Sequence, residues 1–284
     1  MKVSIVIPAY NEEDRITGRL DDLRKTLIGK YGSDVRLIIV DDNSTDNTVK
    51  VVNRYAKKYG QIEVLSDGTG GGKGYALIKG FGYVCNDPPD IIGFVDADTS
   101  YSGTELIKLI NSMNKEKADG AIASRYLKGS KSTGEKRTIT RYIASRSYNA
   151  MVNFLFRFNY RDTQAGAKVF QGKAICSILN QMHLSDMCFD INLLCELKLR
   201  NFKVIEVPVI CKVINNGTKV DVSSEMPKMF IVTLCYKITR TGINKYIPNK
   251  WKGYVYNKLK GRKSAMVVTK SAAPNVALIR ESTE

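Results

Sequence analysis

Short apolar runs that alternate with helix-like segments constrain the fold of this chain more than any other feature. In the first hundred residues, these runs lie at positions 3–7, 35–40, 62–65 and 91–95. Each run is rich in β-branched or aromatic residues and is bounded by polar breakers, which is typical of buried strands. Because strands that alternate with helices form βαβ units, the pattern predicts an α/β fold with a mainly parallel sheet.

The segments between and after these runs predict the remaining elements. We expect early helices at residues 11–30, at 46–59 with Ser44 or Asp46 as the cap, and at 75–84. Further along, we expect helices at 104–114, 141–156 and 187–200, strands at 120–123, 167–170 and 204–211, and a polar loop at 126–136. The turn after the first strand lacks a G-x-G-x-x-G pattern, which disfavours a dinucleotide-binding Rossmann domain.

Acidic side chains directly follow two of the predicted strands. Asp41 and Asp42 end the second run, and Asp96 and Asp98 come directly after the run at 91–95. The carboxyl ends of parallel strands are where open α/β sheets bind ligands, and carboxylate oxygens suit Mg²⁺ or Mn²⁺ that carries a ligand's phosphates. Either cluster alone would also fit an ordinary turn. The two together favour a binding site.

A glycine-rich stretch at residues 68–74 is a third candidate. It resembles a phosphate-binding P-loop in composition only, because no Ser or Thr follows Lys73 at the required place. Glycines let the backbone approach a phosphate, and Lys73 supplies a positive charge. The alternative is a flexible turn.

Basic residues are concentrated near the C-terminal end. Residues 226–284 contain twelve Lys or Arg against two Glu, in a chain of 284 residues with a formal net charge of +16. Such a segment favours nucleic acid or an anionic membrane surface. We expect no nucleic-acid partner, because no such binding motif is present. The apolar stretches are too short to cross a bilayer, so this amphipathic segment should lie on a membrane or pack on the protein itself.

The cysteines show no metal-binding or paired spacing. There are six, none in a C-x-x-C pair, and His183 is the only histidine. This disfavours a Cys/His zinc site and predicts reduced thiols in a cytosolic compartment. Because the first strand begins directly after Met1 and Lys2, we expect no signal peptide.

Four motifs in the first half resemble the family 2 glycosyltransferases. They are IPAYNEE from Ile7, VDDNS from Val40, GKG from Gly72 and DAD from Asp96. The resemblance implies an inverting enzyme with a GT-A fold, a mainly parallel central sheet flanked by helices. The catalytic domain would cover residues 1–222, with a nucleotide-binding half at 1–100 and an acceptor half at 101–222. A basic amphipathic extension would cover 223–284.

Three later motifs are similar to those of the polyprenyl (dolichyl) phosphate hexose synthases. They are SRY from Ser124, RDTQAG from Arg161 and EVPV from Glu206. That branch moves mannose or glucose from a nucleotide sugar onto a lipid phosphate. The resemblance therefore implies a UDP- or GDP-hexose donor and a polyprenyl or dolichyl phosphate acceptor, with the sugar left open. It also implies an enzyme held peripherally on the cytoplasmic side of a membrane, on an anionic surface.

The resemblance assigns expected roles on the donor side. The residues expected at the nucleotide are Pro8, Tyr10, Glu12, Asp42, Lys73 and Asp96. Asp42 would meet the base or the ribose, and Asp96 with Asp98 would hold Mg²⁺ or Mn²⁺ at the diphosphate. Ser100 stands where the mannose enzymes often have a metal-holding Gln, so its role is left open.

The acceptor phosphate requires cations. The candidates are Arg125, Arg141, Arg146 and Lys219. The arginine fork suits phosphate oxygens, although any single arginine could be a solvated surface charge. A phosphate oxygen is already anionic, so the reaction needs little proton removal, and metal and arginine charges would stabilise the leaving group.

Two carboxylates are candidates for the residue nearest the anomeric carbon. Asp162 is the first choice, as base or orienter, and Asp190 is the second. An ion pair of Asp162 with Arg161, or a turn cap, is the structural alternative. Transfer to a hydroxyl of a glycan or lipid is the alternative reaction, and it would need one of these carboxylates as a true base.

Overall fold

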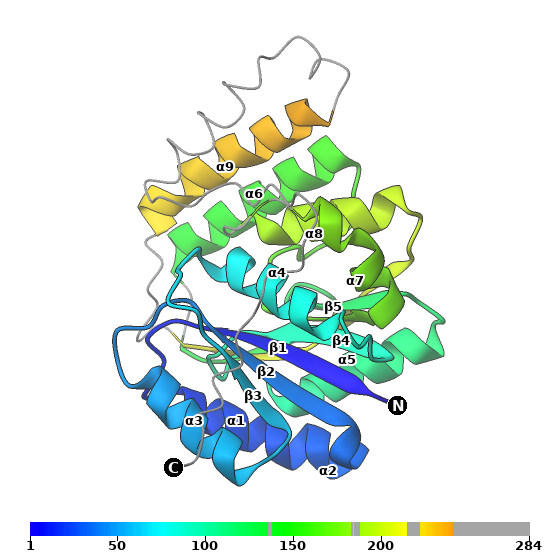
Figure 1. Cartoon of the computed structure of the whole chain (residues 1–284). Coiled ribbons are helices and arrows are strands. Elements are labelled where there is room, and N and C mark those ends of the chain that lie inside the picture. The colour runs from blue at the N-terminus through cyan, green and yellow to red at the C-terminus, as the bar shows by residue number, and fades with distance from the viewer. Residues whose placement is uncertain (136–137, 183, 185–187, 215–221, 241–284) are drawn as a thin grey trace.

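A single seven-stranded sheet with helices on both faces forms the centre of the molecule (Figure 1). The computed structural model describes residues 1–135, 138–182, 184, 188–214 and 222–240. The strands of this sheet are β1 (Val3–Ala9), β2 (Val35–Asp41), β3 (Ile62–Leu65), β4 (Ile91–Val95), β5 (Gly120–Ser124), β7 (Ala167–Gln171) and β8 (Val204–Pro208).

The strand order is β3-β2-β1-β4-β7-β5-β8. All neighbouring pairs are parallel except those of β7, which runs antiparallel to both β4 and β5. The α/β fold with a mainly parallel sheet is therefore confirmed. The registers pair Ala9 with Asp41, so the carboxyl ends of β1 and β2 lie at the same edge of the sheet.

The helices form a layer on each face. They are α1 (Ile16–Leu23), α2 (Gly29–Tyr31), α3 (Thr48–Lys58), α4 (Lys73–Val84), α5 (Gly103–Lys115), α6 (Ile139–Phe156), α7 (Gly172–Ile178), α8 (Phe189–Leu199) and α9 (Val222–Thr239). A π-helical turn, η1 (Arg24–Ile28), joins α1 to α2, and the short 3₁₀ turns are η2 (Gly32–Asp34) and η3 (Leu179–Gln181).

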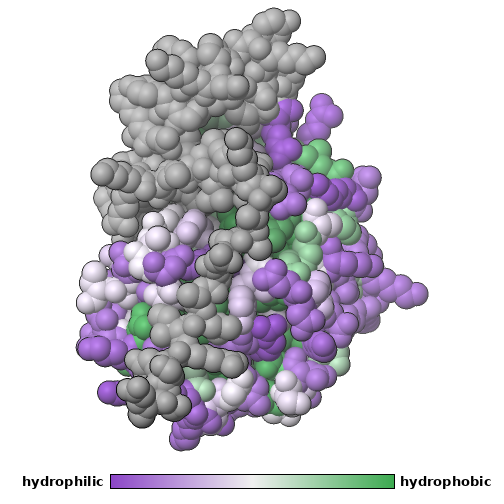
Figure 2. Space-filling model, in the orientation of Figure 1, coloured by the Kyte–Doolittle hydropathy of each residue, from purple (hydrophilic) through white to green (hydrophobic). Residues whose placement is uncertain are grey.

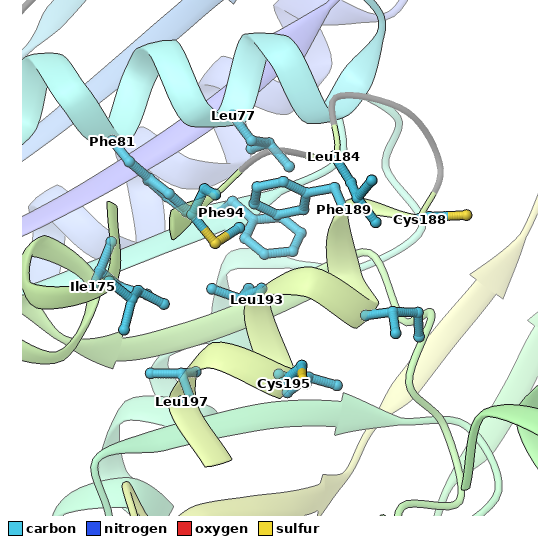
Figure 3. Packing of buried hydrophobic residues seen from close by; sticks show 14 of the residues in the cluster. Leu77, Phe81, Phe94, Ile175, Leu184, Cys188, Phe189, Leu193, Cys195 and Leu197 are labelled. Carbon is cyan, nitrogen blue, oxygen red and sulfur yellow. The ribbon is translucent and has the colours of Figure 1, made fainter. Parts of the chain in front are cut away.

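Alternation along the strands separates two hydrophobic cores. On β1, Ile5 and Ile7 belong to the core beneath α1, α3 and α5, whereas Val6 belongs to the core beneath α4, α7 and α8. This follows from the two-residue period of a strand. Phe94 of β4 and Phe189 of α8 meet edge to face, with ring centroids 6.0 Å apart (Figure 3). Both faces of the sheet are therefore buried.

A second, two-stranded sheet lies outside the main one. It pairs β6 (Lys131–Gly134) in parallel with β9 (Ile210–Val213). The expectation of a loop throughout residues 126–136 is wrong at β6, because this fully exposed strand has no alternating apolar pattern and is defined by pairing with a distant segment. The strand expected at 204–211 was predicted with an interruption at Pro208, and this is confirmed, because β8 ends at Pro208 and β9 begins at Ile210.

Helix α9, the described start of the predicted basic extension, packs on α6 and α8. Met229, Val232 and Tyr236 are buried in the core that contains α4 and α8. The Tyr148 and Thr233 hydroxyls hydrogen bond at 2.8 Å, which ties α9 to α6. The residues beyond 240, including the aromatic and cationic part of that prediction, lie outside the described residues. No helix in the described part of the chain is long and apolar enough to span a membrane.

One disulfide corrects the cysteine prediction. Cys85, at the end of α4, is bonded to Cys176 of α7, with Cα atoms 5.5 Å apart. Reduced thiols were expected throughout, and that is wrong for this pair because two packed helices bring together cysteines 91 residues apart. Cys188, Cys195, Cys211 and Cys235 are free thiols.

Candidate functional site

The loops that follow β1 and β2 are joined by hydrogen bonds. Asn11, in a left-handed conformation with φ of 53°, receives the Thr45 backbone N–H on its side-chain oxygen at 2.7 Å. The Glu12 backbone N–H donates to the Thr48 hydroxyl at 2.7 Å. Tyr10 and Glu12 therefore sit on a braced loop directly after Pro8. The Glu12 carboxylate accepts two hydrogen bonds from the Arg15 guanidinium, each of 2.8 Å.

The Asp42 carboxylate organises the glycine-rich loop. It accepts the Gly71 backbone N–H at 2.6 Å and the Gly72 N–H at 2.9 Å. Gly72 has a φ of 89°, which a residue with a side chain rarely adopts, and it directly precedes the first residue of α4, Lys73. Asp42 thereby holds the backbone of the loop directly before α4 and so positions Lys73, the first residue of that helix. Asp41 is instead buried and accepts the Ser66 hydroxyl at 3.1 Å, which is a structural role.

Lys73 reaches across to the acidic cluster after β4. Its Nζ lies 2.5 Å from Asp96 Oδ1. Burial lowers the pKa of Lys73, but the carboxylates of Asp96, Asp190 and Asp98 raise it more, so the net direction is upward. The ammonium group is thus held in its charged form. Two separate motifs of the sequence, the GKG and DAD strings, therefore meet in one ion pair.

Asp96 and Asp98 offer carboxylate oxygens, the kind of ligand that divalent cations such as Mg²⁺ and Mn²⁺ take. An added Cβ at Gly166 would lie 2.0 Å from Asp96 Oδ2, so only glycine leaves room for this carboxylate. Asp98 Oδ1 accepts the Ser100 backbone N–H at 3.0 Å, which fixes its orientation. Across the described residues, no three acidic, His or Cys side chains converge on a metal site. Two carboxylates suffice for Mg²⁺ or Mn²⁺ when a ligand's phosphates and water complete the shell.

Arg125 and Asp162 form a buried, two-pronged ion pair. Arg125 Nε and Nη2 donate to the two Asp162 oxygens at 2.6 and 2.7 Å, and the Arg125 backbone N–H adds a third bond at 3.0 Å. Burial raises the pKa of the Asp162 carboxyl, but Arg125 lowers it more, so the net direction is downward. The alternative partner Arg161 is not the one that Asp162 uses. This geometry keeps Asp162 ionised and its proton affinity low.

The segment that carries Asp162 is fixed from β8. The Glu206 carboxylate accepts the backbone N–H groups of Arg161 at 2.8 Å and Asp162 at 2.9 Å. Arg146 of α6 donates to the Arg161 carbonyl at 2.7 Å and stacks 4.6 Å from the centre of the Tyr126 ring. The RDTQAG and EVPV motifs are therefore one structural unit.

Asp190 has a buried partner as well. Lys168 of β7 is fully buried, and its Nζ donates to Asp190 Oδ1 at 2.5 Å and to the Ala165 carbonyl at 2.8 Å. Burial lowers the pKa of Lys168, and this effect outweighs the opposing attraction of Asp190. Lys168 Nζ also lies 5.2 Å from the centre of the Phe94 ring.

The predicted site residues fall into two groups. The residues expected on the donor side, Pro8, Asp42, Lys73, Asp96 and Asp98, come from the carboxyl ends of β1, β2 and β4 and from the start of α4. On the acceptor side, Arg125, Asp162 and Arg146 are connected through the 161–162 segment, and Arg141 lies on the first turn of α6. Lys219 lies outside the described residues.

Sequence reasoning missed three residues at this site. They are Arg19, Gly166 and Lys168. A lysine inside an otherwise apolar strand was a usable signal for Lys168, because a buried charge requires a partner. Gly166 offered no signal beyond its place in RDTQAG. Arg19 reads as a surface position on an amphipathic helix, and only the tertiary structure shows that it is buried.

A hydrophobic group is exposed on α6 close to these arginines. Ile139, Tyr142 and Ile143 are 77%, 49% and 57% exposed, and their spacing places them on one face of the helix. Tyr142 also contacts Tyr126 with ring centroids 6.0 Å apart. On the face seen in Figure 2, by contrast, the described right-hand and lower edges are mainly hydrophilic.

Comparison with known proteins gives consistent matches. Residues 4–179 match the sequence profile of glycosyl transferase family 2. A dolichyl-phosphate beta-glucosyltransferase of Saccharomyces cerevisiae is 30% identical over 80% of this chain and 71% of its own length. A protein of the same description from Trichomonas vaginalis is 31% identical over 72% of this chain and 62% of its own. The human one is 28% identical over 80% and 70%.

Solved structures agree on the fold. A mannosyltransferase from Pyrobaculum calidifontis in complex with GDP-Man and Mn²⁺ has a TM-score of 0.58 at 17% identity, over 91% of this chain and 69% of its own. Glucosyl-3-phosphoglycerate synthase of Mycobacterium tuberculosis, with Mn²⁺, UDP and phosphoglyceric acid, has a TM-score of 0.57 at 16% identity, over 83% and 78%. Fold, motifs and sequence similarity lead to one conclusion: the chain belongs to glycosyltransferase family 2 and is a GT-A-fold hexosyltransferase.

Proposed function

We propose that this protein transfers glucose, with inversion, from a nucleoside diphosphate glucose to dolichyl or a related polyprenyl phosphate. The observation that carries the proposal is the Arg125–Asp162 pair, which is buried and closed by three hydrogen bonds. A carboxylate held this way is a poor base, which suits an acceptor that is already an anion. The yeast, Trichomonas and human relatives are dolichyl-phosphate beta-glucosyltransferases, which supports the same acceptor and sugar for this protein.

The donor side would bind the nucleoside diphosphate at the edge where β1, β2 and β4 end. Pro8, Tyr10, Glu12 and Asp42 would contact the nucleoside, with Asp42 at the base or ribose and also holding the glycine loop. Lys73, at the positive end of α4, would meet the diphosphate. UDP-glucose is the first donor to test, and GDP-mannose is the competing one.

Asp96 and Asp98 are the residues that would hold Mg²⁺ or Mn²⁺. Bound there, the ion would stabilise negative charge on the leaving diphosphate. The remaining chemistry belongs to this chain's own side chains. Lys73 adds a second positive charge on the diphosphate side, and the braced loops after β1 and β2 keep the nucleoside in one orientation.

The transfer step is a direct displacement. An oxygen of the acceptor phosphate would attack the anomeric carbon and form the new C–O bond, while the bond from that carbon to the diphosphate breaks and leaves its electron pair on the nucleoside diphosphate. Attack from the opposite side inverts the configuration, and no proton has to move. Asp162 would orient Arg125 rather than act as a base, and Asp190, paired with Lys168, would orient the sugar.

The acceptor side would combine cations with exposed apolar groups. Arg125, Arg141, Arg146 and Lys219 are proposed to hold the acceptor phosphate. The exposed Ile139 and Ile143 on α6 would face the lipid, so that the phosphate enters from a bilayer. In this proposal the catalytic domain is residues 1–222, and the basic segment 223–284 supports peripheral attachment to an anionic membrane on its cytoplasmic side.

The experiment that tests this function is a transfer assay with defined acceptors. Purified protein is incubated with labelled UDP-glucose or GDP-mannose, Mg²⁺ or Mn²⁺, and either dolichyl phosphate or dolichol. We expect labelled lipid only with the phosphate, and more from UDP-glucose. Label in dolichol with loss of activity in Asp162→Asn would instead support a hydroxyl acceptor and a true catalytic base.

A further inference from the structure

The carboxylate of Asp96 is already paired with a cation of the protein itself. Lys73 Nζ lies 2.5 Å from Asp96 Oδ1, so it occupies one of the carboxylate oxygens that a divalent cation would use. Arg19 is fully buried and forms its ion pair with Asp22, at 3.4 Å, while Asp98 and Asp96 act on it only as more remote charges. Asp96 therefore already has a counter-ion, and a divalent ion that enters without displacing Lys73 gains less attraction from this carboxylate.

The two cations differ in freedom. Arg19 is fixed, because its Nη1 donates to the Tyr101 carbonyl at 2.5 Å and to Asp22 Oδ2 at 3.4 Å, while its Nε and Nη2 have no hydrogen-bond partner and are enclosed. The side chain of Lys73 is 23% exposed and that of Asp96 is 32% exposed, so both are partly open to solvent. Lys73 also follows a glycine-rich loop, and its long side chain can turn to another anion.

We propose that Lys73 is an internal counter-ion that keeps Asp96 from binding a divalent cation until a donor diphosphate draws the ammonium group away. The inference rests on the proposed function, because it assumes a diphosphate donor and a divalent cation at this site. The diphosphate supplies a new anion for the Lys73 ammonium group. When Lys73 pairs with the diphosphate, the Asp96 carboxylate becomes available to the divalent cation. Nucleotide and metal would consequently bind together rather than independently.

The test is a Mn²⁺ titration without any acceptor, followed by the electron paramagnetic resonance signal of free Mn²⁺, alone and with UDP or GDP. Wild-type protein should bind Mn²⁺ weakly alone and more tightly with nucleotide. In Lys73→Met, binding without nucleotide should tighten about tenfold or more, because one unit charge next to Asp96 is removed. The gain from nucleotide should shrink in that variant.

Two further variants make the test specific. Lys73→Arg retains the charge and should keep Mn²⁺ binding weak, whereas Lys50→Met removes an equal charge from the exposed surface of α3 and should change nothing. Far-UV circular dichroism and thermal melting check that each variant is folded. Equal or weaker Mn²⁺ binding in folded Lys73→Met, or no Mn²⁺ binding in any state, would overturn the inference.

The outcome is distinguishable from that of the proposed function. If Lys73→Met binds Mn²⁺ more tightly but the wild-type protein transfers sugar to no lipid phosphate, the counter-ion role of Lys73 is supported and the proposed function is rejected. If the wild-type protein makes lipid-linked glucose but Lys73→Met binds Mn²⁺ no more tightly than wild type, the proposed function is supported and the counter-ion role of Lys73 is rejected.

Discussion

The Arg125–Asp162 pair shows what a single interaction does in this site. The side chains are 16% and 2% exposed, and the two-pronged geometry satisfies both carboxylate oxygens. Such a pair is costly to break from one side, because the remaining charge is buried without a partner. It therefore holds the 125 and 162 segments in one arrangement and presents a guanidinium edge whose charge is permanent.

Arg125→Met should therefore destabilise the fold by about 3–5 kcal/mol. The double variant Arg125→Met/Asp162→Leu should recover much of that loss, because no unpaired charge remains. Urea unfolding at pH 7 measures both, and additive losses in the double variant would contradict the pairing. Because the pKa of Asp162 is lowered in the fold, its contribution is complete above the usual carboxyl pKa of 3.8. It should be lost as pH falls through the lower, folded-state pKa.

Gly166 makes a second prediction at the residue scale. In Gly166→Ala the new methyl group would meet Asp96 Oδ2 at 2.0 Å, so the carboxylate must move. We expect roughly a hundredfold loss of kcat/KM with little change in melting temperature, since misplacement by about 1 Å is that costly in a preorganised site. Gly60→Ala, where an added Cβ meets nothing within 4 Å, is the matched control. Unchanged activity in Gly166→Ala would remove Asp96 from the proposed site.

At the scale of elements, periodicity predicted the strands and most of the helices, because each has a strong local pattern. Helices at 104–114 and 141–156 were expected, and the structure has α5 and α6 there. The insertion of antiparallel β7 between β4 and β5 could not be predicted, because strand order depends on long-range pairing. β6 and α7 were missed for the same reason: neither has enough local pattern to be recognised alone.

For the site, too, the local sequence predicted which residues take part, but it did not predict which side chains pair with one another. Motif positions located the carboxylates and arginines, since these lie at the ends of readable strands. Their partners were not predictable: Asp162 binds Arg125 rather than Arg161, and Lys168 was not considered at all. Such pairings are set by how strands far apart in the chain come together.

The Cys85–Cys176 disulfide belongs to the element scale, because it connects the ends of α4 and α7. Closing a loop of this length reduces the conformational entropy of the unfolded chain, which stabilises the folded protein by up to about 4 kcal/mol. Cys85→Ser/Cys176→Ser should therefore lower the melting temperature, and dithiothreitol should do the same to wild-type protein only. A melting temperature of the wild-type protein that does not respond to dithiothreitol would contradict the bond.

At the scale of the whole molecule, one end of α6 combines cations with exposed apolar side chains. If this end meets the bilayer, Ile139→Ser/Ile143→Ser should weaken binding to anionic vesicles while leaving the melting temperature unchanged, because both side chains are exposed. Vesicle sedimentation measures the binding. Leu199→Ser, at the end of α8, removes another exposed apolar side chain and is the control. Equal binding in all three proteins would place the membrane contact elsewhere.

The central claim is that a phosphate anion accepts the sugar, and the most direct measurement is the lipid product itself. Wild-type protein and Asp98→Asn are given labelled UDP-glucose, Mn²⁺ and dolichyl phosphate in vesicles, and the extracted lipid is analysed for label and anomeric configuration. The account predicts dolichyl-phosphate-linked glucose of inverted, β configuration from wild type and almost none from Asp98→Asn. Absence of labelled lipid phosphate from wild-type protein with both UDP-glucose and GDP-mannose would contradict it.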